Sequence, residues 1–104
     1  MNLSQTQIEN FKIEGYLFIP DLFSIDEVKV LQSDLPRIFS LNREEIERDA
    51  ESNEPRLAAA MHEYSEPFAA MLRHPRLLEP AHQILGGEVY CHQYKVVTKQ
   101  PFGQ

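Results

Sequence analysis

The feature that most constrains the fold is a polar strand predicted near the end of the chain, within ILGGEVYCHQYKVVTKQPFGQ (residues 84–104). The glycine pair is typical of a helix C-terminus. Residues 88–98 are then predicted to form a strand, and both of its faces carry side chains that need to be covered. Only residues 99–104 follow, and the one other candidate strand is YLFIP, residues 16–20. Because an isolated pair of strands is marginal in water, we expect this chain to be unstable, to aggregate or to assemble unless further sequence completes the sheet.

The two faces of the predicted strand carry different chemistry. Alternate residues share a face, so one face carries Gln93, Lys95, Val97 and Lys99, and the other carries His92, Tyr94, Val96 and Thr98. An amide and two ammonium groups in a row can hold a carboxylate-bearing ligand. The alternative is a strand face that simply meets solvent.

Helices are predicted between the two strands and before the first. Four start signals are present: Ser4, the capping box of Ser24 and Glu27, Ser65-Glu66-Pro67, and Pro75. Gly15 is placed to end the first helix. The second has an apolar stripe of Val28, Leu31, Leu35 and Ile38, and Pro36 is expected to kink or end it. Pro80 is expected to bend the last helix.

The acidic stretch NREEIERDAESNE, residues 42–54, has six acids, two arginines and one large apolar residue, Ile46. Such charge runs usually face water, so the stretch is predicted to be a solvated helix or a mobile loop. A lid over a nearby pocket is the alternative. The charge of such a lid would disfavour an anionic substrate if it lay close to the site.

Composition excludes several classes of function. The net charge of -6 repels nucleic acid and anionic lipid, and no apolar run approaches the roughly 18 residues of a membrane span. No secretory signal is present at the N-terminus, and the single cysteine, Cys91, fits a reducing cytoplasm and is predicted to be a small strand residue. At 104 residues the chain is one domain or part of one.

No motif in the chain builds a metal or nucleophile site. HEYSE, residues 62–66, begins like a zinc-protease helix but has Glu66 where the second histidine should be. His62, His74 and His82 are therefore interpreted as partly exposed helix residues. The glycine pair follows a helix where a phosphate loop would open one, and no serine lies in a GxSxG motif.

Two segments, NFKIEGYLFIPDLFSIDEVKVLQSDL and HPRLLEPAHQILGGEVYCHQYKVVTKQPFG, together resemble the N-terminal portion of the phytanoyl-CoA dioxygenase family. The shared order is Phe-x-x-x-Gly-Tyr, Ile-Pro-x-Leu-Phe-Ser, His-Pro, Leu-Gly-Gly, a Gln-x-Lys strand and Lys-x-x-Phe-Gly. The likeness spans nearly the whole chain and is weakest over residues 40–55.

The resemblance implies an α+β chain that holds the first strands of a double-stranded β-helix (jelly-roll, cupin-like) oxygenase, with the barrel incomplete. Residues 1–104 would be a single N-terminal segment of one oxygenase domain: 1–85 mainly helical with a short strand near 16–20, then an early barrel strand over 88–98. Tyr90, His92 and Tyr94 would pack against the helices.

The resemblance also implies Fe(II) and 2-oxoglutarate in the complete protein. The family's iron is held by a His-x-Asp or His-x-Glu pair and a distant histidine. None of the four histidines here has an acid two residues later, so the metal ligands are expected beyond this segment. Gln93, Lys95 and Val97 would face substrate or cosubstrate. Val97 stands where many relatives have asparagine, which alters the local cosubstrate contact.

Two functions from different classes follow. In the first, the complete protein hydroxylates or halogenates a small organic metabolite with 2-oxoglutarate, and the isolated segment is inactive. In the second, the chain is a non-enzymatic helical module that binds a protein partner through apolar surfaces at Phe11, Phe18 and Phe23.

Overall fold

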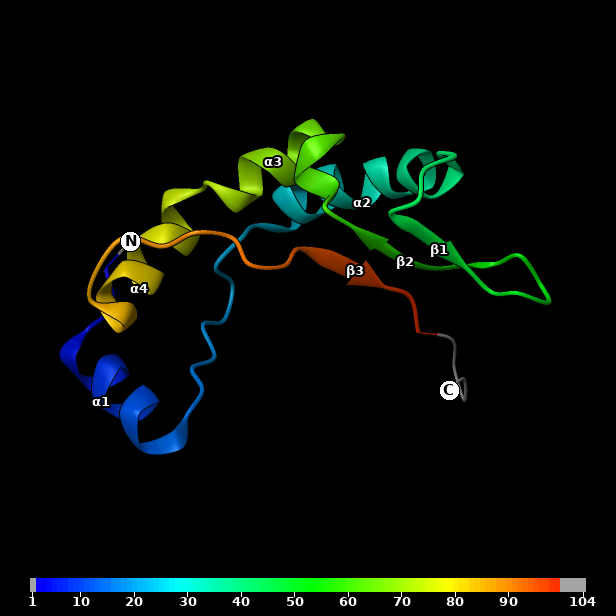
Figure 1. The fold of residues 1–104 in the computed structure, drawn as a ribbon. Coiled ribbons are helices and arrows are strands. Elements are labelled where there is room, and N and C mark those ends of the chain that lie inside the picture. Colours follow the sequence, from blue (N-terminus) through cyan, green and yellow to red (C-terminus); the bar gives the residue numbers. More distant parts are fainter. Residues whose placement is uncertain (1, 100–104) are drawn as a thin grey trace.

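The computed structural model describes residues 2–99 of the chain. Its helices are α1 (Gln5–Glu14), α2 (Ile25–Ser40), the 3-10 helix η1 (Met61–Glu63), α3 (Glu66–Leu72) and α4 (Pro75–Leu85), and its strands are β1 (Ile46–Arg48), β2 (Pro55–Ala59) and β3 (Lys95–Val97). The molecule is elongated, with principal extents of 48 × 30 × 26 Å. Helices α2 and α3 lie along one face of the small sheet, while α1 and α4 lie at the far end of the molecule (Figure 1).

Capping residues fix the helix ends as the sequence predicts. Ser4 and Ser24 both form capping boxes, in which the serine hydroxyl accepts from the N3 backbone amide and the N3 side chain accepts from the serine amide. Gly15 and Gly86 end α1 and α4 in the left-handed conformation, with φ of 82° and 77°. Ser65 caps α3, with Pro67 in its first turn.

The predicted apolar stripe on α2 is only partly buried. Ile38 is fully buried, Leu31 and Leu35 pack around the core, and Val28 remains 39% exposed. The sheet lies beside the C-terminal part of α2, so the N-terminal part of the stripe has less to pack against (Figure 1). Pro36 does not end α2, which continues to Ser40.

The prediction of a strand over residues 16–20 is wrong. Residues 16–19 have no regular secondary structure, and Tyr16 and Phe18 are 67% and 76% exposed. A strand needs a neighbour for its backbone hydrogen bonds, and the described sheet consists of β1, β2 and β3 alone. Although the segment is apolar, its backbone pairs with no strand within residues 2–99.

The prediction of a solvated helix or mobile loop over residues 42–54 is also wrong, because this stretch supplies β1 and the turn of a β-hairpin. Strand β1 pairs antiparallel with β2, with Ile46 opposite Ala58. The Asp49 carboxylate accepts from the amides of Glu51 and Ser52 at 2.9 and 3.0 Å, which closes the turn. Burial of Ile46, the one large apolar residue of the stretch, holds the acidic strand in place.

The sheet has the order β1-β2-β3, with both pairs antiparallel. Its inner face packs on Ile38, Met61 and Phe68 to form the core. The predicted strand over residues 88–98 is shorter than expected, since only Lys95–Val97 form a ladder and Cys91 lies outside it. The Phe-Gly part of the Lys-x-x-Phe-Gly pattern lies outside the described residues.

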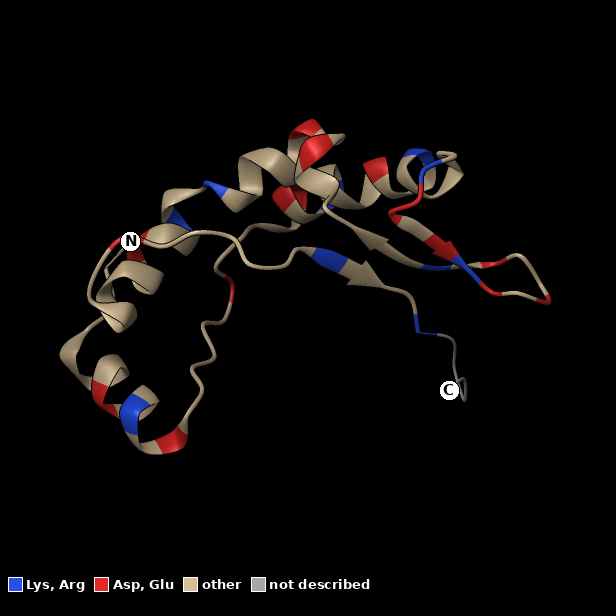
Figure 2. Ribbon diagram, viewed as in Figure 1, with Lys and Arg blue, Asp and Glu red and all other residues tan. Residues whose placement is uncertain are grey.

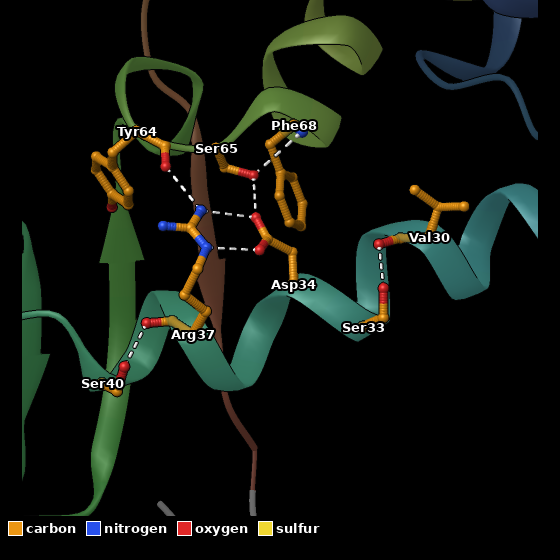
Figure 3. A network of polar contacts seen from close by, with 8 residues as sticks. All are labelled: Val30, Ser33, Asp34, Arg37, Ser40, Tyr64, Ser65 and Phe68. Carbon is orange, nitrogen blue, oxygen red and sulfur yellow. Dashed lines mark hydrogen bonds and ion pairs between the residues drawn. The ribbon is translucent and has the colours of Figure 1, made fainter.

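A polar network joins α2 to the start of α3 (Figure 3). The Arg37 guanidinium donates to both carboxylate oxygens of Asp34, at 2.7 and 2.9 Å, and to the Tyr64 carbonyl at 2.8 Å. Ser65, which is buried, donates its hydroxyl to Asp34 at 2.6 Å and accepts from the Phe68 amide. The segment between β2 and α3 is thereby tied to α2.

Candidate functional site

The outer face of the sheet carries the candidate site. Residues directly opposite each other in antiparallel strands share a face, and the register places Glu47 opposite Leu57, and Leu57 opposite Val97. Ala59 lies opposite Lys95 on the same face. The helices cover the inner face, so this outer face, defined by the five residues just named, is open (Figure 1). We call it the open face.

A cavity of about 540 Å³ lies at one end of the open face. Its wall includes Glu47 from β1, Ala59 from β2 and Lys95 from β3. Gln93, which lies two residues before Lys95, also lines it. The sequence-predicted residues Gln93 and Lys95 are therefore brought together at one cavity. Val97 lies on the same face but lines a smaller hollow of about 90 Å³.

A strained turn borders this cavity. Ala60 has φ of 55°, a left-handed conformation that costs energy for a residue with a Cβ, and its amide donates to the Tyr94 carbonyl at 2.7 Å. His62 stacks on the Tyr94 ring, with centroids 5.7 Å apart and planes 16° apart. The His62 Nδ1 atom is buried and has no hydrogen-bond partner among residues 2–99. Strained backbone and unsatisfied buried polar atoms concentrate at functional sites.

Tyr94 fixes β3 to the core beneath the cavity. Its hydroxyl donates to the Phe68 carbonyl at 3.0 Å, and burial raises the pKa of the phenol to about 12. The prediction that Tyr94 packs against the helices is confirmed. The same prediction is wrong for Tyr90, which is 86% exposed, and for His92, which is also exposed.

The described residues do not fit an iron centre. Within residues 2–99, no group of three or more histidine, cysteine, aspartate or glutamate side chains is placed to hold a metal ion. His74 instead caps α4, where its Nδ1 accepts from the Arg76 amide at 3.1 Å. The donors on the open face fit a carboxylate better, because Lys95 offers an ammonium and Gln93 an amide.

Sequence reasoning missed Glu47, Ala59 and His62 as cavity residues. The hairpin that positions Glu47 and Ala59 could have been predicted from Asn53. This turn-forming residue, which takes φ of 60°, lies between the apolar residues Ile46 and Leu57. The placement of His62 beside Tyr94 depends on a tertiary contact and has no local signal.

None of the helices within residues 2–99 combines the length and the apolar character that crossing a membrane requires.

Comparison with known proteins places these features in a family. A family model described as phytanoyl-CoA dioxygenase (PhyH) matches residues 11–104. The ectoine dioxygenase of Bordetella parapertussis is 35% identical over 104 residues, which cover 96% of this chain and 34% of that protein. The ectoine dioxygenase of Halomonas elongata is 32% identical over 104 residues, which cover 96% of this chain and 31% of that protein.

A solved structure also matches this chain. The crystal structure of EctD from S. alaskensis with bound Fe matches with a TM-score of 0.82 and 33% identity, over 89% of this chain and 34% of that one. The chain thus spans about a third of the length of the curated relatives that it matches. Since the family model covers nearly the whole sequence, the chain belongs to the phytanoyl-CoA dioxygenase (PhyH) family.

Proposed function

We propose that this chain forms the N-terminal part of a non-haem Fe(II)- and 2-oxoglutarate-dependent dioxygenase that oxidises a small organic metabolite, most simply by hydroxylation. The observation that carries the proposal is the TM-score of 0.82 against the iron-bound EctD structure, at 33% identity. The ectoine dioxygenases named above support the same reaction class. A reducing cytoplasm as its location is part of the proposal, from the single cysteine.

In this proposal the open face is the wall against which 2-oxoglutarate binds. Lys95 supplies an ammonium and Gln93 an amide to a cosubstrate carboxylate, and Val97 offers only an apolar contact further along the face. When bound, iron and 2-oxoglutarate together supply the activation of dioxygen. The part of the chain described here contributes no cluster of metal ligands, so its own role is to bind and orient the organic partners.

The outer edge of β3 supports completion of the sheet into a jelly roll by residues outside this segment. Tyr94 accepts from the Ala60 amide and Thr98 donates to the Arg56 carbonyl at 2.9 Å, so these two residues point their backbone groups toward β2. Backbone direction alternates along a strand, so Lys95 and Val97 point their amides and carbonyls away from β2. Strand β3 is the last strand of the described sheet, and its outer edge is available for another strand.

The alternative of a helical partner-binding module is less well supported. It requires Phe11, Phe18 and Phe23 to offer apolar binding surfaces. Phe18 is exposed, but Phe23 lies under the Arg76 guanidinium, 4.6 Å from its ring centroid, and contacts the His74 ring edge-on. Phe23 is therefore already engaged within the fold, in contacts with Arg76 and His74.

Iron-dependent turnover tests the proposal. The full-length protein that contains this segment is expected to convert 2-oxoglutarate to succinate and carbon dioxide when Fe(II) is added, and to stop when iron is chelated. The 104-residue chain alone is expected to bind Fe(II) no better than a metal-free control protein and to form no succinate. Succinate formation by the isolated chain, or its absence from the iron-loaded full-length protein, would contradict the proposal.

A further inference from the structure

The hairpin places one carboxylate of the acidic stretch on the open face. Glu47 lies in β1 opposite Leu57 and lines both the large cavity and the smaller hollow. The neighbouring acids are placed differently: Glu44 lies in the turn before β1, and Glu45 pairs with Arg43 at 2.9 Å. The fold therefore places Glu47 on the open face, which distinguishes it from Glu44 and Glu45.

The charges around the cavity are divided between its sides. Lys95 lies on β3, Glu47 lies on β1, and the apolar side chains of Leu57 and Ala59 lie on β2 between them. Strands are about 4.8 Å apart, so the two charged strands are separated by roughly 10 Å. Figure 2 shows a basic residue at the start of β3 and both acidic and basic residues on the hairpin. Glu63, from η1, adds a second carboxylate to the cavity wall.

Neither charge is neutralised by the protein within the described part of the chain. The side chains of Glu47 and Lys95 form no hydrogen bond or ion pair with each other or with any other residue among 2–99. In the complete protein, residues and ligands that cover the open face would take both groups out of water. A carboxylate that is removed from water without a cationic partner or hydrogen-bond donors is strongly disfavoured.

We infer that Glu47 binds a cationic nitrogen of the organic substrate and so determines substrate charge. The inference rests on the proposed function, in which Lys95 on the opposite side faces the carboxylate of 2-oxoglutarate. Two carboxylates against one ammonium at the cavity favour a positively charged group and repel a second anion. In this arrangement Glu47 selects a cationic substrate, whereas Lys95 binds the anionic cosubstrate.

The experiment uses the full-length protein with Fe(II) and 2-oxoglutarate. Its substrates are a panel of small compounds of matched size: ectoine, which carries a cationic amidinium and a carboxylate, alkylammonium compounds, neutral amides and carboxylic acids. Substrate-stimulated release of carbon dioxide from 2-oxoglutarate is the readout. The accepted compounds are expected to carry a cationic nitrogen.

The variant Glu47→Gln is then compared with the matched control Glu44→Gln. A charge-assisted hydrogen bond is worth enough that its loss is expected to lower kcat/KM for the accepted cationic substrate about tenfold. The KM for 2-oxoglutarate is expected to stay unchanged, and Glu44→Gln is expected to match the parent in both constants.

Two results would overturn the role of Glu47. One is acceptance of only neutral or anionic compounds, or of none of the panel. The other is equal kcat/KM for the Glu47→Gln and Glu44→Gln variants. In both cases, continued iron-dependent decarboxylation of 2-oxoglutarate would leave the proposed function standing. Complete absence of that decarboxylation in the parent protein would instead contradict the proposed function, and the role of Glu47 would fail with it.

Discussion

The hydroxyl of Ser65 donates to the carboxylate of Asp34 at 2.6 Å, across 31 residues of sequence, and this bond fixes the start of α3 on α2 (Figure 3). The same hydroxyl caps α3 by accepting from the Phe68 amide. The hydrogen bonds from Ser65 and Arg37 hold the pKa of Asp34 below its usual range, with Arg37 the larger cause. The bond therefore joins the capping of one helix to the packing of another.

Replacement of Ser65 by alanine is expected to destabilise the fold by about 1–3 kcal/mol, because it removes a helix cap and leaves buried polar groups unsatisfied. Ser33→Ala is the matched control, since that hydroxyl bonds only to the Val30 carbonyl of its own helix and should change stability by less than about 0.5 kcal/mol. Chemical denaturation of both variants measures the difference. Equal stabilities would show that the Asp34 bond adds nothing.

The ion pair of Glu27 and Arg76 gives the fold a dependence on acid. Arg76 lowers the pKa of Glu27 from 4.5 to about 2, and the Ser24 amide contributes to the same shift. A carboxyl whose pKa is lowered in the folded state stabilises the fold above its unfolded pKa, and this stabilisation is lost as protons bind.

Stability contributed by Glu27 is therefore expected to be complete above about pH 4.5 and to disappear as the pH falls toward about 2. Melting temperatures of the parent and of Glu27→Gln should differ at pH 6 and converge near pH 2. Asp26→Asn, which removes a carboxylate from the same helical turn, serves as the control. A gap between parent and Glu27→Gln that does not narrow with acid would contradict the assignment.

The free edge of β3 predicts a pattern of hydrogen exchange. The Lys95 and Val97 amides point away from β2 and should exchange quickly in the 104-residue chain, whereas the Thr98 amide, bonded to Arg56, should exchange more slowly. In the full-length protein, an added strand should protect Lys95 and Val97 as well. NMR exchange rates measure this, and unprotected Lys95 and Val97 amides in the full-length protein would contradict completion of the sheet at this edge.

Local signals in the sequence were sufficient to predict the starts of the four α-helices and the ends of α1 and α4. The hydroxyls of Ser4 and Ser24 and the left-handed glycines Gly15 and Gly86 act within a few residues of themselves, so their roles can be predicted without knowledge of the fold. The alternation of exposure along the last strand was predicted for the same reason, with Lys95 exposed and Val96 packed against the core.

The hairpin and the failed strand show where local signals end. The β-branched and aromatic composition of residues 16–20 favours a strand, but a strand also requires an adjacent partner, and none is present among the described residues. Residues 57–59 read Leu-Ala-Ala, which carries no strand preference, yet they form the central strand because Ile46 and Val96 pair on both sides of Ala58. Tertiary pairing therefore decided both outcomes.

The candidate site was predicted in part. Gln93 and Lys95 were identified from their alternation and from the family resemblance, and the structure places both at one cavity. The other walls come from β1, β2 and η1, whose positions depend on the hairpin register and on the contact of His62 with Tyr94. Their role in binding, like that of Val97, stays a prediction.

The central claim is that the open face binds the cosubstrate. The KM of the full-length protein for 2-oxoglutarate tests this claim most directly. Lys95→Gln removes the ammonium and is expected to raise the KM for 2-oxoglutarate about tenfold or more, since a hydrogen bond to a charged group is lost. The matched control Lys29→Gln, on the exposed surface of α2, should leave that KM unchanged. Iron affinity should be the same in both variants. A KM for 2-oxoglutarate that is unchanged by Lys95→Gln would contradict the claim.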